Sequence, residues 1–130
     1  MLEAGLSLCT RHTAGAVVVE LGGRLTARTV STLECVLVKL LACVDRPLVV
    51  DLARVDDCDR AGASMLSAAA WVAASVAGDV GSPLRLAAPS PRTWTVLCAC
   101  RVPDTVAVFT TVAAATDGDA RLRLPAVPVS

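Results

Sequence analysis

The chain has 130 residues, which is enough for one domain with a single hydrophobic core. It carries 12 basic and 12 acidic side chains, so its formal net charge is zero, and neither sign forms a long run. This argues against a nucleic-acid-binding protein, which usually shows a basic stripe. The hydrophobic fraction is 55% and the aromatic fraction only 2%, so a core of Val, Leu and Ala is expected.

Two strands and a helix are expected in the first third of the chain. Weak alternation over residues 5–11 indicates an edge strand, and the apolar run at 16–21 indicates a firmer strand that ends at Gly22-Gly23. These two strands are close enough in sequence to form an antiparallel hairpin. Thr26 is then suited to the N-cap of a helix, and apolar residues recur at helical spacing to about residue 43.

Strands and helices alternate in the rest of the chain. The expected elements are a strand at 48–52, a helix at 62–77, a strand at 84–88, a helix from Ser90-Pro91 to about residue 100, a strand at 106–109 and a short helical turn at 111–116. The order ββαβαβαβ predicts a single α/β domain with a mixed, mostly parallel sheet and helices packed on it. The domain is placed at 1–116, and a flexible C-terminal tail is expected at 117–130.

One segment raises the question of a membrane span. Residues 61–78 form an uncharged run of 18 residues, near the lower limit for a spanning helix. Most of them are Ala, Ser and Gly, which gain little in lipid, and the bulkier ones recur along one helical stripe. The stripe consists of Met65, Leu66, Ala69, Val72, Ala73 and Val76. We therefore expect a core helix and no membrane insertion. Because Glu3 interrupts any secretory signal at the start, a cytoplasmic location is expected.

The sequence contains no catalytic set and no clear metal site. His12 is the only histidine and lies in a polar turn, which favours a solvated residue over a catalytic base. No phosphate-binding loop or dinucleotide motif occurs, and Ser64 has no histidine partner in view. Asp56, Asp57 and Asp59 are clustered, but no Glu or Asn follows at the spacing of a metal loop, so a polar turn with a helix-capping aspartate is favoured. Catalytic residues, bound metals and cofactors are therefore not expected.

The cysteines are interpreted as free thiols. They stand at positions 9, 35, 43, 58, 98 and 100, with no C-x-x-C pair. In a reducing cytosol most of them are expected to be small buried hydrophobes. Cys58 precedes a helix start and could be reactive, although a structural role is favoured. Cys98 and Cys100 point about 200° apart on a helix, so at least one should be buried and a bridge between them is not expected.

The stretch Asp59-Arg60-Ala61-Gly62 lies at the expected start of the helix at 62–77. Free backbone N–H groups and the positive end of the helix dipole lie at such a position. A glycine there, having no Cβ, would allow a phosphate or the backbone of a partner to approach closely. This corner is therefore the candidate binding site.

Four stretches of the chain resemble the STAS domain of bacterial anti-sigma factor antagonists. In order they are V-V-V-E-L-G-G-R-L-T-A-R-T, L-V-V-D-L, V-D-D-C-D-R-A-G-A and L-R-L-A-A-P-S-P-R-T-W-T-V-L. The resemblance covers roughly residues 5–116 and implies a protein that is not an enzyme and needs no cofactor. Members of this family bind an anti-sigma factor, often a kinase of the histidine-kinase-like ATPase fold, and so free a sigma factor.

The resemblance places a partner-binding switch loop at 58–63. The residues implied to bind the partner are Thr26, Asp59, Arg60, Ala61, Gly62 and Ala63. In the family a kinase phosphorylates a Ser or Thr of this loop, and the added charge weakens the complex. The phosphoacceptor position corresponds to Ala61, which has no hydroxyl, and Ser64 lies one helical turn too far along to replace it. The usual switch is therefore not expected to operate.

Two further positions depart from the family pattern. Thr26 stands where an acidic residue is frequent, and Arg101 stands where a glycine is common after the third helix. Three functional interpretations remain open. The first is an antagonist held permanently in its unphosphorylated form, with Arg60 facing an acidic patch on the partner. The second is an adaptor module of a transporter ATPase or another signalling assembly, and the third, disfavoured for want of catalytic residues, is an enzyme. Against all of them stands the possibility that Arg60 is only a solvated turn residue in a degraded interface.

Overall fold

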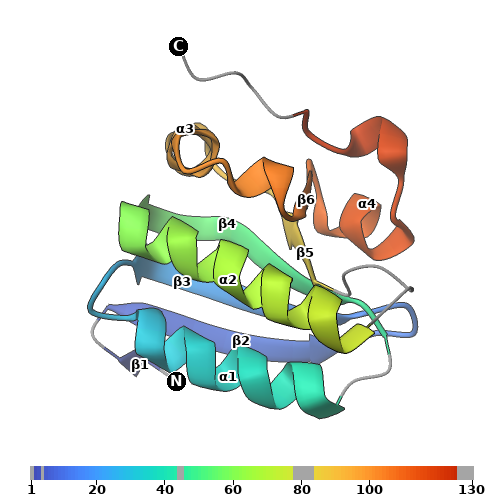
Figure 1. The fold of residues 1–130 in the computed structure, drawn as a ribbon, viewed down its shortest axis with the longest axis horizontal. Coiled ribbons are helices and arrows are strands. Elements are labelled where there is room, and N and C mark those ends of the chain that lie inside the picture. Colours follow the sequence, from blue (N-terminus) through green and yellow to red (C-terminus); the bar gives the residue numbers. More distant parts are fainter. Residues whose placement is uncertain (1, 4, 44–45, 78–83, 126–130) are drawn as a thin grey trace.

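The protein is built on one six-stranded sheet with the order β1-β2-β3-β4-β5-β6 (Figure 1). The computed structural model describes residues 2–3, 5–43, 46–77 and 84–125. The strands are β1 (Leu2–Glu3), β2 (Leu6–His12), β3 (Val17–Leu25), β4 (Leu48–Cys58), β5 (Leu84–Ala87) and β6 (Ala107–Phe109). β1, β2 and β3 pair antiparallel, whereas β3 to β6 pair parallel. The expected mixed, mostly parallel α/β sheet with an antiparallel hairpin at one edge is confirmed.

The helices cover the two faces of the sheet unequally. They are α1 (Val30–Cys43), α2 (Arg60–Ala77), α3 (Pro91–Ala99) and α4 (Val112–Asp117), with short 3₁₀ turns at Val102–Asp104 and Ala120–Leu122. Alternate residues of β3 divide between two cores, as the period of a strand requires. Val17 and Val19 join the main core with residues of α1, α2 and α3. Val18 joins a smaller core with Ala114 and Ala115 of α4 on the opposite face.

Local sequence signals set the ends of α3 as expected. The Ser90 hydroxyl accepts a hydrogen bond from the Thr93 N–H at 3.2 Å, and Pro91 is the first helical residue. After the helix, Arg101 adopts the left-handed conformation with φ 60°. Glycine adopts this conformation without steric cost. The left-handed turn is therefore kept although position 101 holds Arg and not the glycine that the family pattern suggested.

β3 does not end at Gly22-Gly23, as the sequence suggested, but continues to Leu25. The pairing of β3 with β4 shifts register between Glu20 and Gly22 and again between Gly23 and Arg24. Gly23 has φ +91°, and a Cβ there would overlap the Gly5 carbonyl oxygen. The two glycines therefore permit bulges in a strand that continues, and do not terminate it.

β4 also extends further than expected, to Cys58 instead of residue 52. Beyond Asp51 it pairs with β3 alone, since the pairing with β5 ends at Asp51. Only Val55 and Cys58 are buried in this extension, and its other residues are exposed. The polar composition of residues 53–58 gave no signal for a strand, because a segment that is paired on one side only needs few apolar side chains.

Residues 117–125 are not the loose tail that was expected. Asp117 is the last residue of α4, and Gly118 caps it with φ +65°. Arg123 forms an antiparallel bridge with Phe109, and the Leu124 N–H donates to the Val108 carbonyl at 2.7 Å. Backbone pairing and partial burial of Leu124 thus attach this segment to β6. The expected tail residues 126–130 lie outside the described part of the chain.

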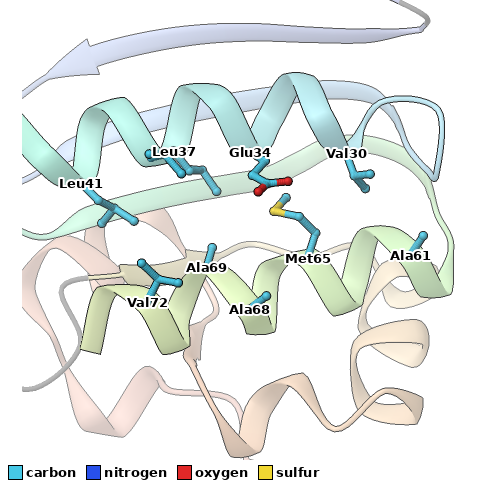
Figure 2. A pocket seen from close by; sticks show the side chains of 10 residues that line it. Val30, Glu34, Leu37, Leu41, Ala61, Met65, Ala68, Ala69 and Val72 are labelled. Atoms are coloured by element: carbon cyan, nitrogen blue, oxygen red, sulfur yellow. The ribbon is translucent and has the colours of Figure 1, made fainter. Parts of the chain in front are cut away.

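The apolar stripe expected on α2 is partly buried in the main core and partly exposed on the flank that faces α1. Leu66 and Ala73 are buried in the main core, together with Ala63 and Ala70, which the stripe did not include. Met65 and Ala69 are half-buried and Val72 is exposed, because this flank of α2 faces α1 and not the sheet (Figure 2). The side chain of Val76 lies outside the described residues. None of the described helices is long and apolar enough to cross a bilayer.

Candidate functional site

Asp59 joins two segments of backbone at the start of α2. Its Oδ1 accepts a hydrogen bond from the Gly62 N–H at 2.9 Å, which caps the helix. Its Oδ2 accepts from the Ala27 N–H at 3.1 Å, in the loop before α1. The Asp59 N–H in turn donates to the Leu25 carbonyl at 3.1 Å. The β3–α1 loop and the β4–α2 corner are therefore held together as one unit.

The loop before α1 is organised by Thr29, which sequence reasoning missed. Thr29 is fully buried, and its hydroxyl donates to the Arg24 carbonyl at 2.9 Å and accepts from the Thr26 N–H at 2.9 Å. The Thr26 carbonyl accepts from the Val30 N–H at 3.0 Å, as an N-cap residue would, but α1 itself begins only at Val30. The sequence signal that could have indicated this role is the position of Thr29 directly before Val30, the first residue of α1.

Gly62 and Ala63 face the interior and not the solvent. A Cβ on Gly62 would lie 2.8 Å from Leu25 Cγ and would overlap the Leu25 carbonyl oxygen. The space left by the missing side chain is therefore already filled by β3, and not held open for a phosphate or a partner. Ala63 is also fully buried. These two residues build the corner but present no surface, contrary to the expectation that they contact a partner.

Arg60 and Ala61 form the accessible part of the corner, with Thr26 beside them. Arg60 is exposed, while Thr26 and Ala61 are half-buried. Arg28, in the adjoining loop, is exposed as well. Within the described ranges neither arginine forms an ion pair or a side-chain hydrogen bond. Two guanidinium groups are therefore available to an acidic partner at this end of the molecule.

An apolar groove runs from this corner along α1 and α2 (Figure 2). Its volume is about 340 Å³. It is lined by Val30, Glu34, Leu37, Val38 and Leu41 of α1 and by Ala61, Met65, Ala68, Ala69 and Val72 of α2. Ala61 and Val30 lie at the end next to the corner, and Glu34 is the one ionisable group in the lining. The sequence showed some of these residues, such as Leu37, Met65 and Val72, only as part of a helical stripe, and did not indicate the groove.

Cys58 is a structural residue and not a reactive thiol. Burial, with a smaller contribution from the nearby Asp59 carboxylate, raises the pKa of its thiol from the ordinary 9.0 to about 12. A thiol of this kind stays protonated and is a poor nucleophile at neutral pH. The favoured interpretation of Cys58 is therefore supported, and its position before a helix start does not activate it.

The other described cysteines are free. Cys98 of α3 is buried, and Cys100, the C-cap residue of that helix, is half-buried, as their spacing suggested. The expectation that most cysteines are buried is wrong for Cys9 and Cys35, which are exposed. His12 is exposed at the end of β2, in agreement with a solvated residue. Among the residues that the structure describes, no cluster of three or more His, Cys, Asp or Glu could hold a metal ion.

Solved structures of similar fold define the structural class. An anti-sigma factor antagonist from Mycobacterium paratuberculosis is 19% identical, with 87% of this chain and 92% of that chain covered and a TM-score of 0.74. SpoIIAA in its unphosphorylated form is 18% identical, with coverages of 86% and 95% and a TM-score of 0.67. Bacillus SpoIIAA in its phosphorylated form is also 18% identical and gives a TM-score of 0.61. At these identities the likeness establishes a shared SpoIIAA-like fold.

A larger protein contains the same fold as one part. SLC26A9 is 16% identical over 83% of this chain and 20% of its own, with a TM-score of 0.52. The family model described as "Mlab, STAS domain" matches residues 9–102, which is more than half of the chain. The chain therefore belongs to the STAS domain family. No curated protein sequence matches it.

Proposed function

We propose that this chain is a non-catalytic regulatory protein, similar to anti-sigma factor antagonists, that acts in the cytoplasm by binding an anti-sigma factor. The observation that carries the proposal is the corner at 58–63, where Asp59 holds Arg60 and Ala61 at the exposed start of α2 beside the loop of Thr26. The partner class favoured by the family resemblance is a kinase of the histidine-kinase-like ATPase fold. Arg60 is the residue suited to an acidic patch on such a partner.

Phosphorylation at the usual position is not part of this proposal. Solved structures of SpoIIAA exist in phosphorylated and unphosphorylated forms. In this chain the corresponding residue is Ala61, which cannot accept a phosphate. Ser64 is exposed, but it lies one helical turn further into α2. The chain would therefore stay in its binding form whether or not the kinase is active.

The binding test uses the anti-sigma factor recovered by affinity capture and then purified. Arg60→Glu should weaken the complex at least tenfold, because it places a carboxylate opposite the partner's acidic patch. Arg11→Glu is the control, since Arg11 is exposed on β2 beside Val18, at the end of β3 opposite the corner, and its replacement should leave affinity unchanged. Equal affinity of the wild-type chain and Arg60→Glu, measured by titration calorimetry, would exclude the corner as the binding site.

The phosphorylation test uses the same kinase with ATP. The wild-type chain should acquire no phosphate on residues 59–64 by mass spectrometry, whereas Ala61→Ser should acquire one if the loop geometry is intact. Phosphate on Ser64 of the wild-type chain would contradict the proposal. If Ala61→Ser binds the kinase but acquires no phosphate, the binding proposal stands. The assignment of position 61 as the phosphoacceptor position would then be wrong.

A second candidate function is an adaptor module of a transporter ATPase or another assembly. It is favoured by the match to SLC26A9, in which the similar region covers only 20% of a larger chain. Affinity capture distinguishes the two candidates, because the first predicts recovery of an anti-sigma factor and the second recovery of a transporter ATPase. Direct binding to the purified candidate, lost in Arg60→Glu, would be required in either case.

A further inference from the structure

The groove between α1 and α2 has a defined length. Its lining runs from Val30 to Leu41 along α1 and from Ala61 to Val72 along α2, and the two helices point in the same direction (Figure 2). On each helix the last lining residue lies 11 positions beyond the first. At the rise of an α-helix this gives a groove about 16 Å long, which equals about three helical turns.

The groove also has a defined order of charges. Arg28 and Arg60 are exposed at the corner, where the groove begins. Glu34 lies one helical turn beyond Val30, about 6 Å along α1, and Figure 2 shows its side chain pointing toward Met65 across the groove. The rest of the lining is apolar. A partner therefore meets a positive end, then one carboxylate, and then about 10 Å of apolar surface.

The Glu34 carboxylate restricts what can cover the groove. Within the ranges that the structure describes, it forms no ion pair and no side-chain hydrogen bond. An occupant that fills the groove removes this carboxylate from water, and a buried charge without a partner is strongly unfavourable. The occupant must therefore bring a cation to the level of Glu34. A fatty acid brings none, and neither does the α2 helix of a second copy, since residues 61–77 carry no charge.

The walls of the groove favour a helix over an extended peptide. Both walls are α-helices, and the backbone groups of a helix are paired internally except at its ends. An extended segment between them would have unpaired backbone groups once water is excluded. A helix pairs its own backbone groups and presents only side chains, with apolar residues at i, i+3, i+4 and i+7 toward the groove. About three turns of such a helix match the length of the groove.

We propose that the groove receives an amphipathic helix of the anti-sigma factor that is bound at the corner. A Lys or Arg of this helix pairs with Glu34, carboxylates at its corner end meet Arg28 and Arg60, and its apolar face covers the remaining lining. The inference rests on the proposed function, because it extends the same interface from the corner along α1 and α2. It also gives the partner helix a recognisable pattern: acidic, then basic, then apolar.

The charge at position 34 is tested by titration calorimetry with the purified anti-sigma factor. Glu34→Lys should weaken the complex by about tenfold or more, because it places two cations against each other. Cys35→Lys is the matched control, since Cys35 is the next residue of α1, is exposed and does not line the groove. Its replacement should leave the affinity unchanged. Replacing the matching Lys or Arg of the partner by Glu should restore the affinity for Glu34→Lys.

The apolar part of the groove is tested at two consecutive residues of α2. Val72→Glu should weaken the complex by about tenfold or more, because a carboxylate would enter an apolar contact. Trp71→Glu is the matched control, since Trp71 is 70% exposed and lines a separate hollow with Asp104 and Thr105. Its replacement should leave the affinity unchanged. Circular dichroism should show unchanged folding in all variants.

Three results would overturn the inference. Wild-type affinity in Glu34→Lys and Val72→Glu, with binding still weakened by Arg60→Glu, would remove the groove from the interface and leave the proposed function intact. Native mass spectrometry that finds a dimer or a bound small molecule, removed by Val72→Glu, would give the groove another occupant. Failure to recover any anti-sigma factor would overturn the inference and the proposed function together.

Discussion

At the scale of single residues, the Asp59 carboxylate links two segments of the chain, because each of its oxygens accepts a hydrogen bond from a backbone N–H group. Asp59→Ala should lower the free energy of unfolding by about 1–3 kcal/mol, combining a lost helix cap with an unpaired N–H at Ala27. Urea unfolding monitored by circular dichroism measures the change. Asp56→Ala is the control, since Asp56 is exposed on β4 and its loss should change stability by less than about 0.5 kcal/mol.

The raised pKa of Cys58 predicts how stability depends on alkaline pH. Below pH 9.0 the thiol is protonated in the folded and unfolded states and contributes no pH dependence. Between 9.0 and about 12 the unfolded chain releases the proton while the folded chain keeps it, so stability falls as pH rises. The wild-type chain should therefore lose up to about 1.4 kcal/mol more per pH unit in this range than Cys58→Ala. Parallel slopes in urea titrations at pH 8 and pH 10 would contradict the assignment.

The sequence predicted some roles at this scale and not others. The capping role of Asp59 followed from its place before a helix, because such caps act over three residues of the same segment. The role of Gly62 did not, since the space beside it is occupied by Leu25 from a distant part of the chain. The exposure of Cys9 and Cys35 likewise depends on which face each element presents, which composition does not determine.

At the scale of elements, the contact between α2 and β3 requires a glycine at position 62. Gly62→Ala improves helix propensity by up to about 1 kcal/mol, but its Cβ would meet the Leu25 backbone and Cγ. Because backbone cannot move aside easily, the variant should be destabilised by about 1–3 kcal/mol net. Ser64→Ala, at an exposed position of the same helix, should instead be neutral or slightly stabilising. A thermal melt that shows Gly62→Ala as stable as the wild type would mean that α2 can shift away from β3.

Element boundaries were predicted best where the signals were local. The start of α3 at Ser90-Pro91 was correct, because a cap hydroxyl and a proline act within one turn. The ends of β3 and β4 were placed too early, because glycines and polar residues usually stop strands. In this sheet Gly22 and Gly23 lie in bulges of β3. Asp56 and Asp57 lie in the part of β4 that pairs with β3 alone.

At the scale of the whole molecule, the segment at 117–125 completes the sheet. A chain ending at residue 116 would lose the Phe109–Arg123 bridge, the Thr110–Leu122 hydrogen bond of 3.0 Å and the burial of Leu124. It should unfold at a lower temperature, with a loss of about 1–3 kcal/mol for the hydrogen bonds and apolar contact removed. A chain ending at residue 125 is the reference, so that only residues 117–125 differ between the two truncated chains. Equal melting temperatures for these two chains would show that the segment does not contribute to stability.

The architecture was predictable from sequence because strands and helices alternate along it, and such alternation restricts the sheet to a few topologies. The groove between α1 and α2 was not predictable. It depends on the spacing between two helices and on side chains such as Met65 and Val38 that share neither a segment nor a motif. Trp71, which is 70% exposed, was not singled out either. It lies off the apolar stripe of α2, but a large apolar residue on a helix usually indicates core before it indicates surface.

The attachment of residues 122–124 to β6 has a consequence for how this molecule can meet others. On one side of the sheet the backbone of β6 is already engaged by the chain itself. On the other side β1 is only two residues long and pairs with Leu6 and Ser7, so within the described ranges residues 9–12 of β2 pair with β3 alone. A peptide that binds by extending a sheet needs a free row of donors and acceptors. Strand addition is thereby directed away from β6 and toward the end of β2, at the opposite margin of the sheet.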